Sequence, residues 1–149
     1  MRKQPSSTFA IQESTSMDWD QFDAETRRLG RKITDVSDII VAIARGGVIP
    51  GALLAKLLDV KDMFILTMRR DGGARHMSAY ALPDIRGKNI LLVEDMIETG
   101  RALIEGKKYL EARGAIVKTA CLYTMPNSEI TPDYSLEEIP KVMDFPWNR

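Results

Sequence analysis

Oxygen-bearing side chains follow an apolar run near the middle of the chain. Residues 90–93 (ILLV) form this run, and it is followed by the adjacent carboxylates Glu94 and Asp95 and then by Glu98 and Thr99. Adjacent carboxylates can accept hydrogen bonds from two neighbouring hydroxyl groups, or hold Mg²⁺ through water. The chemistry expected here is therefore binding of a diol or of a cation.

The elements around these residues predict where they lie. A short, uninterrupted apolar run is typical of a strand buried on both faces of a parallel sheet. Thr99 is a candidate N-cap for a helix that reaches Gly114, a candidate C′ residue. The start of such a helix exposes backbone N–H groups that favour a phosphate. A phosphate-binding site beside a diol-binding site predicts a site for ribose 5-phosphate. The alternative interpretation is a solvated acidic turn with no ligand.

Other apolar patterns predict the rest of the fold. Strands alternate with helices, which predicts an α/β fold: a single domain with a parallel sheet and helices on both faces. Ligands of such sheets bind at the carboxyl ends of the strands. Residues 1–16, rich in Ser, Thr and Gln, are expected to form a flexible tail. The expected elements are a helix starting at Asp18, a strand at 38–44, a helix at 48–58 with Pro50 in its first turn, a strand at 63–68, a mobile loop at 69–81 and a strand at 117–124.

A second turn with binding chemistry follows the strand at 38–44. Ala44 and Arg45 precede Gly46 and Gly47, and paired glycines let a backbone approach a ligand closely. A basic residue beside them suits an anion such as pyrophosphate. The alternative is an ordinary tight turn between a strand and a helix.

The predicted loop at 69–81 is basic. Arg69, Arg70, Arg75 and His76 could close over a polyanionic ligand and exclude water from it. A solvated basic hairpin would explain the same residues.

Composition excludes several classes of partner. Lys plus Arg and Asp plus Glu each number 21 in 149 residues, so no overall positive charge attracts nucleic acid or an acidic membrane. Cys121 has no second cysteine to pair with and lies in an apolar run, which indicates a core residue in a reducing compartment. No apolar stretch is long enough to span a membrane, and the first residues lack a signal peptide's apolar region. We expect a cytoplasmic protein.

Two stretches resemble a known family, the type I phosphoribosyltransferases. VEDMIETGRAL, residues 93–103, resembles the family's loop that binds 5-phosphoribosyl 1-diphosphate (PRPP). IVAIARGGVIPGALLAKLL, residues 40–58, resembles the pyrophosphate loop of the bacterial xanthine-guanine branch. The apolar-acidic-X-Pro-Trp ending resembles that branch's hood, so the likeness spans residues 17–147. It implies a phosphoribosyltransferase domain at 17–149 with a small hood built from the chain ends, about 126–149.

The resemblance implies transfer of a 5-phosphoribosyl group from PRPP to a nucleobase, with a purine as the expected acceptor and release of pyrophosphate. Mg²⁺ would arrive with PRPP rather than at a resident metal site. The partners would be PRPP and a nucleobase, with no nucleic acid or membrane, and the chain would form a dimer or tetramer. The Ala44–Arg45 peptide bond would be cis. The implied residues are Glu98, Glu94 and Asp95 for catalysis, Thr99, Gly100, Arg101 and Ala102 for the 5′-phosphate, Ala44, Arg45, Gly46 and Arg69 for pyrophosphate, and Met125, Val142, Met143 and Asp144 for the base.

Departures from the family pattern keep two other functions open. Met125 stands where relatives that bind 6-oxopurines have a lysine, and Val142 stands where they have a stacking ring. Glu98 replaces an aspartate, and Ala102 replaces a threonine or serine. These changes are compatible with a regulatory module that binds PRPP without catalysis. A hydrolase or another nucleotide-binding enzyme on a similar sheet is the second alternative.

Overall fold

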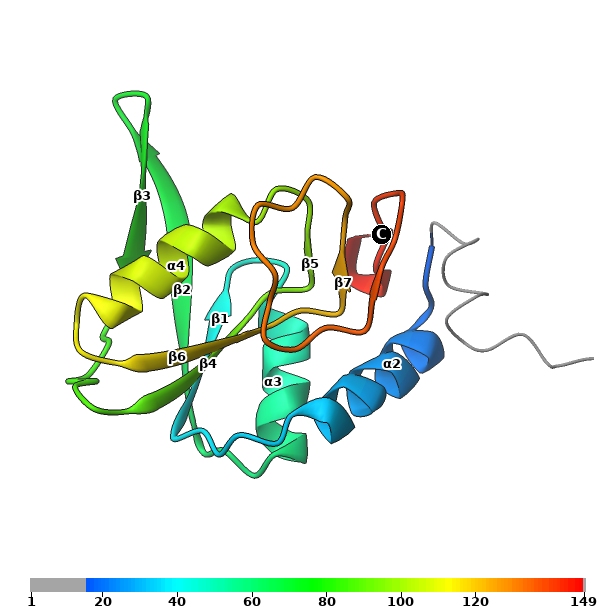
Figure 1. The fold of residues 1–149 in the computed structure, drawn as a ribbon, viewed down its shortest axis with the longest axis horizontal. Helices are drawn as coiled ribbons and strands as arrows, with labels where there is room; N and C mark the ends of the chain where they lie inside the picture. Colours follow the sequence, from blue (N-terminus) through cyan, green and yellow to red (C-terminus); the bar gives the residue numbers. More distant parts are fainter. Residues whose placement is uncertain (1–15, 149) are drawn as a thin grey trace, which may run out of the picture.

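A central five-stranded sheet organises the protein, and the computed structural model describes residues 16–148 (Figure 1). Its strand order is β3-β2-β1-β4-β6, and a smaller sheet has the order β5-β7-β8. The predicted tail at 1–16 therefore lies almost wholly outside the described residues. The elements are α2 (Trp19–Lys32), β1 (Ile39–Ile43), α3 (Val48–Leu57), β2 (Asp62–Asp71), β3 (Ala74–Ala79), β4 (Asn89–Val93), β5 (Met96–Ile97), α4 (Arg101–Glu111), β6 (Ile116–Ala120), β7 (Tyr123–Thr124), β8 (Glu137–Glu138) and the 3₁₀ helix η1 (Pro146–Asn148).

The main sheet is mixed rather than wholly parallel. β1 pairs in parallel with β2 and β4, and β4 pairs in parallel with β6, as predicted. β2 and β3, however, form an antiparallel hairpin where the sequence predicted a mobile loop. Gly72 and Gly73 connect the two strands with φ values of 57° and 87°. Two consecutive positive φ values give a turn whose twist matches that of the strands, so the polar residues on either side form a hairpin. Figure 1 shows its tip extending beyond the other strands.

Helices cover both faces of the main sheet, as predicted. Phe22 and Leu29 of α2 and Leu54 of α3 pack in one core cluster with Ile40 and Leu91. The other face of the same strands packs against α4, and this second cluster contains Val41, Leu92, Leu103 and Leu110. Side chains of β1 and β4 thus alternate between two cores, which explains why β1 is apolar throughout and β4 is apolar after Asn89.

Helix ends differ in detail from the predicted ones. α2 begins at a capping box in which the Asp18 side chain accepts from Gln21 N at 2.7 Å. The N-cap of α4 is Gly100, with φ of 82°, and not Thr99. A Cβ atom at Gly100 would lie 2.4 Å from Ile130 Cγ2, so close packing and a left-handed backbone both require glycine here. α4 ends at Glu111, before the predicted Gly114.

The predicted strand at 117–124 is two strands. β6 ends at Ala120, and β7 then pairs with β5 and β8 in the smaller sheet. Tyr134 helps to redirect the chain, because its backbone oxygen accepts from Cys121 N at 3.1 Å. The chain ends meet beside this sheet, where Met17 N donates to Asp144 O at 3.0 Å. The hood that the sequence predicted at about 126–149 stays a prediction, since β5 and β7 of the smaller sheet lie outside that range.

Candidate functional site

Two turns meet at the carboxyl ends of β1 and β4. The first contains Gly46 and Gly47, and the second contains Glu94 and Asp95. A Cβ atom on Gly46 would lie 2.4 Å from Asp95 Oδ2, and one on Gly47 would lie 2.3 Å from Val93 O. Neither position can carry a side chain without movement of the acidic turn. The glycines are therefore required because the acidic turn lies against them.

The residues before these glycines complete the first turn. The Ala44–Arg45 peptide bond is cis, as the resemblance implied. Arg45 is exposed, and within residues 16–148 it forms no ion pair. Its guanidinium is available to an anionic ligand.

Backbone hydrogen bonds hold the acidic pair in place. Glu94 N donates to Ala120 O at 3.0 Å, and Leu122 N donates to Asp95 O at 2.8 Å. Asp95 Oδ1 accepts from Met96 N at 2.7 Å, which fixes the direction of the carboxylate. The pair is thus positioned by β6 and by the start of the smaller sheet.

Burial changes the protonation of both carboxyls. It raises the pKa of Glu94 to about 8, and the neighbouring charge of Asp95 raises it further in the same direction. Burial also raises the pKa of Asp95, against the lowering effect of its hydrogen bond from Met96 N. Glu94 in the free protein is therefore largely protonated at neutral pH. A cation or a set of ligand hydroxyls that favours the ionised form would shift this equilibrium.

Two cavities open on either side of Glu94. The larger has a volume of about 600 Å³ and is lined by Ala44, Arg45, Gly46, Glu94, Asp95, Trp147 and Asn148. The smaller has a volume of about 270 Å³ and is lined by Arg75, Glu94, Met96, Ile97, Glu98, Thr99, Gly100, Arg101 and Ala102. The smaller cavity lies at the first turn of α4, where a helix start favours an anion; of these N–H groups, Arg101 N makes a long hydrogen bond of 3.4 Å to Thr99 Oγ1. Glu94 lines both cavities, so one ligand with two ends could fill them together.

Most of the predicted site residues line these cavities. The larger contains the predicted residues of the pyrophosphate turn except Arg69, and the smaller contains Glu98 and the predicted phosphate loop. Arg69 instead lines a hollow at the edge of the sheet with Thr67 and Tyr80.

The predicted base-binding residues lie away from the lining of both cavities. Met143 is buried with 1% exposure, and Val142 is 51% exposed. Met125 N donates to Ile97 O at 3.0 Å, and Asp144 O accepts from Met17 N. Their role in base binding stays a prediction.

Sequence reasoning missed two residues that line the larger cavity, Trp147 and Asn148. The Trp147 ring stacks on Phe145 with centroids 4.8 Å apart and contacts Phe22 edge-on at 5.0 Å. Asn148 N donates to Phe145 O at 3.0 Å. The aromatic-Pro-Trp ending indicated a segment that is anchored in the core. The signal that could have placed this segment at the site is Asn148, the polar residue directly after Trp147.

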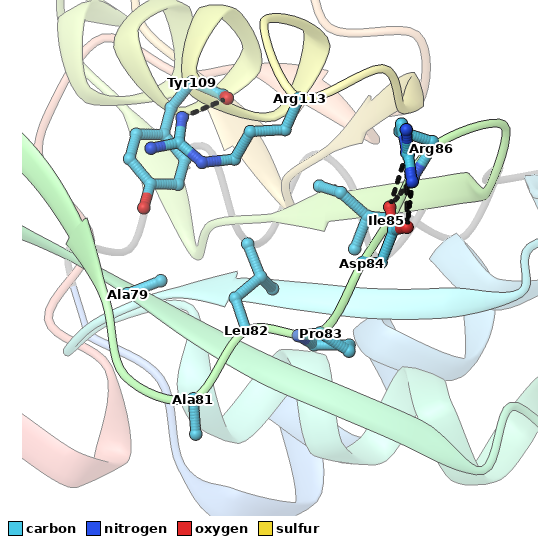
Figure 2. A pocket seen from close by; sticks show the side chains of 9 residues that line it. All are labelled: Ala79, Ala81, Leu82, Pro83, Asp84, Ile85, Arg86, Tyr109 and Arg113. Carbon is cyan, nitrogen blue, oxygen red and sulfur yellow. Dashed lines mark hydrogen bonds and ion pairs between the residues drawn. The ribbon is translucent and has the colours of Figure 1, made fainter.

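A separate cavity of about 530 Å³ lies near the other end of α4 (Figure 2). Its charged groups are satisfied within the chain. Arg86 Nη2 pairs with Asp84 at 2.8 Å, and the Arg113 guanidinium lies 3.5 Å from the centre of the Tyr109 ring. This cavity contains none of the predicted site residues, and we assign no function to it.

Residues 16–148 contain neither a cluster of metal-ligating side chains nor a helix that could span a membrane. No three His, Cys, Asp or Glu side chains gather there in an arrangement that could hold a metal ion. No helix in this part of the chain has the length and apolar character needed to cross a membrane.

Comparisons with known proteins agree with this geometry. The family described as phosphoribosyl transferase domain matches residues 18–148. The hypoxanthine-guanine phosphoribosyltransferase of Lactococcus lactis subsp. lactis is 37% identical over 112 residues, covering 68% of this chain and 61% of that protein. A ribose-phosphate pyrophosphokinase of Pasteurella multocida is 35% identical over 85 residues, which cover 57% of this chain and only 27% of that protein. Among solved structures, a purine phosphoribosyltransferase from Pyrococcus horikoshii has a TM-score of 0.82 and 28% identity, covering 90% of this chain and 93% of the other.

Proposed function

We propose, from the premise that this chain belongs to the phosphoribosyl transferase domain family, that it transfers a 5-phosphoribosyl group from PRPP to a purine base and releases pyrophosphate. The observation that supports this most directly is the pair of cavities joined at Glu94. PRPP carries a phosphate at one end of the sugar and a diphosphate at the other. The smaller cavity offers helix N–H groups for the first, and the larger offers Arg45 and the glycine turn for the second.

Each group at the site has a role in this proposal. Backbone N–H groups at Thr99, Gly100, Arg101 and Ala102 bind the 5′-phosphate. Glu94 and Asp95 accept hydrogen bonds from the ribose hydroxyls. Mg²⁺ enters as part of the substrate, and Arg45 neutralises charge that develops on the departing diphosphate.

The chemical step exchanges one bond at carbon 1 of the ribose for another. The bond to the diphosphate oxygen breaks, a bond to a ring nitrogen of the base forms, and the nitrogen's proton passes to Glu98 as general base. Trp147 and Asn148 line the diphosphate side of the site, and we propose that they contact the base. Trp147 would supply an aromatic face, and the Asn148 amide would supply one donor and one acceptor group.

A module that binds PRPP without catalysis is the second candidate function. Met125 favours it, because a thioether cannot donate the hydrogen bond that relatives supply from lysine. Met125 is partly buried against a core cluster and is absent from the lining of both cavities. The assembly state and the cytoplasmic location stay predictions from the sequence.

A pyrophosphate-release assay separates these functions. Mg–PRPP would be mixed with adenine, guanine, hypoxanthine, xanthine or uracil, with a base-free reaction as the control. The proposal expects release with at least one purine and none without a base. PRPP binding by calorimetry with no release for any base would support the sensing module. Release of phosphate from nucleotides in the absence of PRPP would instead support a hydrolase.

A further inference from the structure

Arg75 is the one lining residue of the smaller cavity that comes from outside residues 94–102. It belongs to β3 of the hairpin, whereas the other lining residues lie on one continuous strand–turn–helix segment. The hairpin therefore brings a positive charge to a cavity whose other donors are backbone groups at the start of α4.

The register of the hairpin explains why Arg75 faces α4. Residues two apart in a strand share a face, so Arg75 lies on the same face as Met77. Met77 is 9% exposed and packs in the core cluster that contains Leu103 of α4. Its cross-strand partner, Met68, packs against the same cluster. The methionine pair thus anchors this face of the hairpin on α4 and places Arg75 over the helix start.

The charges around Arg75 leave it available for an anion. Within residues 16–148 it forms no ion pair, whereas Arg101 pairs with Glu129 at 3.8 Å. Arg75 itself is exposed.

We infer that Arg75 binds the 5′-phosphate of the sugar phosphate from the hairpin side, an inference that rests on the proposed function. A guanidinium presents a fork of N–H donors that matches two phosphate oxygens. The phosphate would then be held by backbone N–H groups on one side and by Arg75 on the other. This contact supplies a side-chain donor at a phosphate-binding site where Ala102 has no hydroxyl group.

A neighbouring cavity of about 570 Å³ provides the matched control. It shares Arg75 and Arg101 with the smaller cavity and also contains Lys108, which pairs with Glu105 at 3.9 Å. Lys108 is absent from the lining of the smaller cavity. Lys108→Ala removes one positive charge near Arg75 without removing a phosphate ligand.

The test is calorimetry on the wild type, Arg75→Ala, Arg75→Lys and Lys108→Ala. The probes are ribose 5-phosphate, Mg–PRPP and inorganic pyrophosphate. We expect Arg75→Ala to weaken ribose 5-phosphate and PRPP binding about tenfold or more, since hydrogen bonds between charged groups are the strong ones. Arg75→Lys should lose less of the affinity for these two ligands. The affinity for pyrophosphate should not change in either variant. Lys108→Ala should bind all three ligands as the wild type does. Thermal unfolding of each variant identifies any loss of folded protein.

Three results would overturn the inference. The first is unchanged ribose 5-phosphate affinity in Arg75→Ala while the wild type binds PRPP, which leaves the proposed function intact. The second is an equal loss of ribose 5-phosphate affinity in Lys108→Ala, which would indicate that any nearby positive charge has the same effect. The third is a loss confined to pyrophosphate, which would place Arg75 at the other end of PRPP. A wild type that binds neither sugar phosphate would overturn the proposed function and this inference together.

Discussion

The Asp95 carboxylate fills the space that a side chain on Gly46 would occupy, with Oδ2 only 2.4 Å from the position of a Cβ atom there. The two residues are far apart in the sequence, and each belongs to a different strand-to-helix connection. Their contact joins the glycine turn after β1 to the acidic turn after β4.

Gly46→Ala should displace Asp95 and weaken Mg–PRPP binding by about tenfold or more, because the new methyl group and the carboxylate cannot share one position. Calorimetry measures the change. Gly30→Ala is the matched control, since a Cβ atom there would have its nearest neighbour, Leu57 Cδ1, at 3.5 Å. Alanine inside α2 should stabilise the helix by about 0.5–1 kcal/mol and leave binding unchanged. Wild-type PRPP affinity in Gly46→Ala would contradict the arrangement.

Glu94→Gln should flatten the dependence of stability on pH. The folded protein keeps a proton on Glu94 up to a pKa of about 8, whereas the unfolded chain releases it near the ordinary value of 4.5. The folded state therefore binds more protons between these values, and the free energy of unfolding of the wild type falls as pH rises from about 5 to 8. Urea unfolding at pH 5, 6, 7 and 8 should show a fall of about 1 kcal/mol or more that the variant lacks.

Asp95 contributes in the same direction, because its pKa is also raised by burial. The free energy of unfolding of the Glu94→Gln variant therefore still falls as pH rises, but less steeply than that of the wild type. Glu138→Gln changes an exposed carboxyl and should keep the full wild-type slope. Parallel curves for the wild type and Glu94→Gln would show that Glu94 ionises normally in the folded protein.

Tyr123→Phe should lower the free energy of unfolding by about 1–3 kcal/mol. The Tyr123 hydroxyl donates to Glu25 Oε2 at 2.8 Å, and Glu25 is 3% exposed. Arg28 also pairs with this carboxylate at 2.9 Å, so the variant leaves one buried acceptor position without its donor. Tyr109→Phe is the matched control, because its hydroxyl makes no hydrogen bond within residues 16–148. Equal stability of the two variants would contradict a structural role for the buried pair.

Glu98→Gln should lower kcat for pyrophosphate release by about 10²–10⁴-fold and leave PRPP affinity nearly unchanged. Glu98 is exposed at the smaller cavity, so its replacement removes a proton acceptor and little packing. Glu98→Asp restores a carboxylate one methylene shorter and should recover part of the rate. An unchanged kcat in Glu98→Gln would assign the base role to another group.

Elements with strong local patterns could be predicted from the sequence. β4 lies where four consecutive apolar residues predicted a buried strand, because both of its faces meet a core. The helix predicted to start at Asp18 is α2, which starts at Trp19 with Asp18 as its N-cap. The adjacency of the glycine and acidic turns followed from a general property of parallel sheets, in which strand ends gather on one edge.

Features that depend on distant contacts could not be predicted in the same way. The hairpin at β2 and β3 has mostly polar residues, and its stability comes from the Gly72–Gly73 turn and from methionines that pack on α4. Asn148 reaches the larger cavity next to Trp147, whose ring contacts Phe22 of α2 edge-on, more than a hundred positions earlier, and stacks on Phe145. No local pattern in the sequence encodes that return of the chain.

Glu94 lines both cavities, and its carboxyl is mostly protonated in the free protein at neutral pH. A ligand that requires the ionised carboxylate must therefore displace a proton into the solvent when it binds. The buffer takes up that proton with its own heat of ionisation. The heat of Mg–PRPP binding at pH 7 should consequently differ between phosphate and Tris buffers, and the difference counts the protons released.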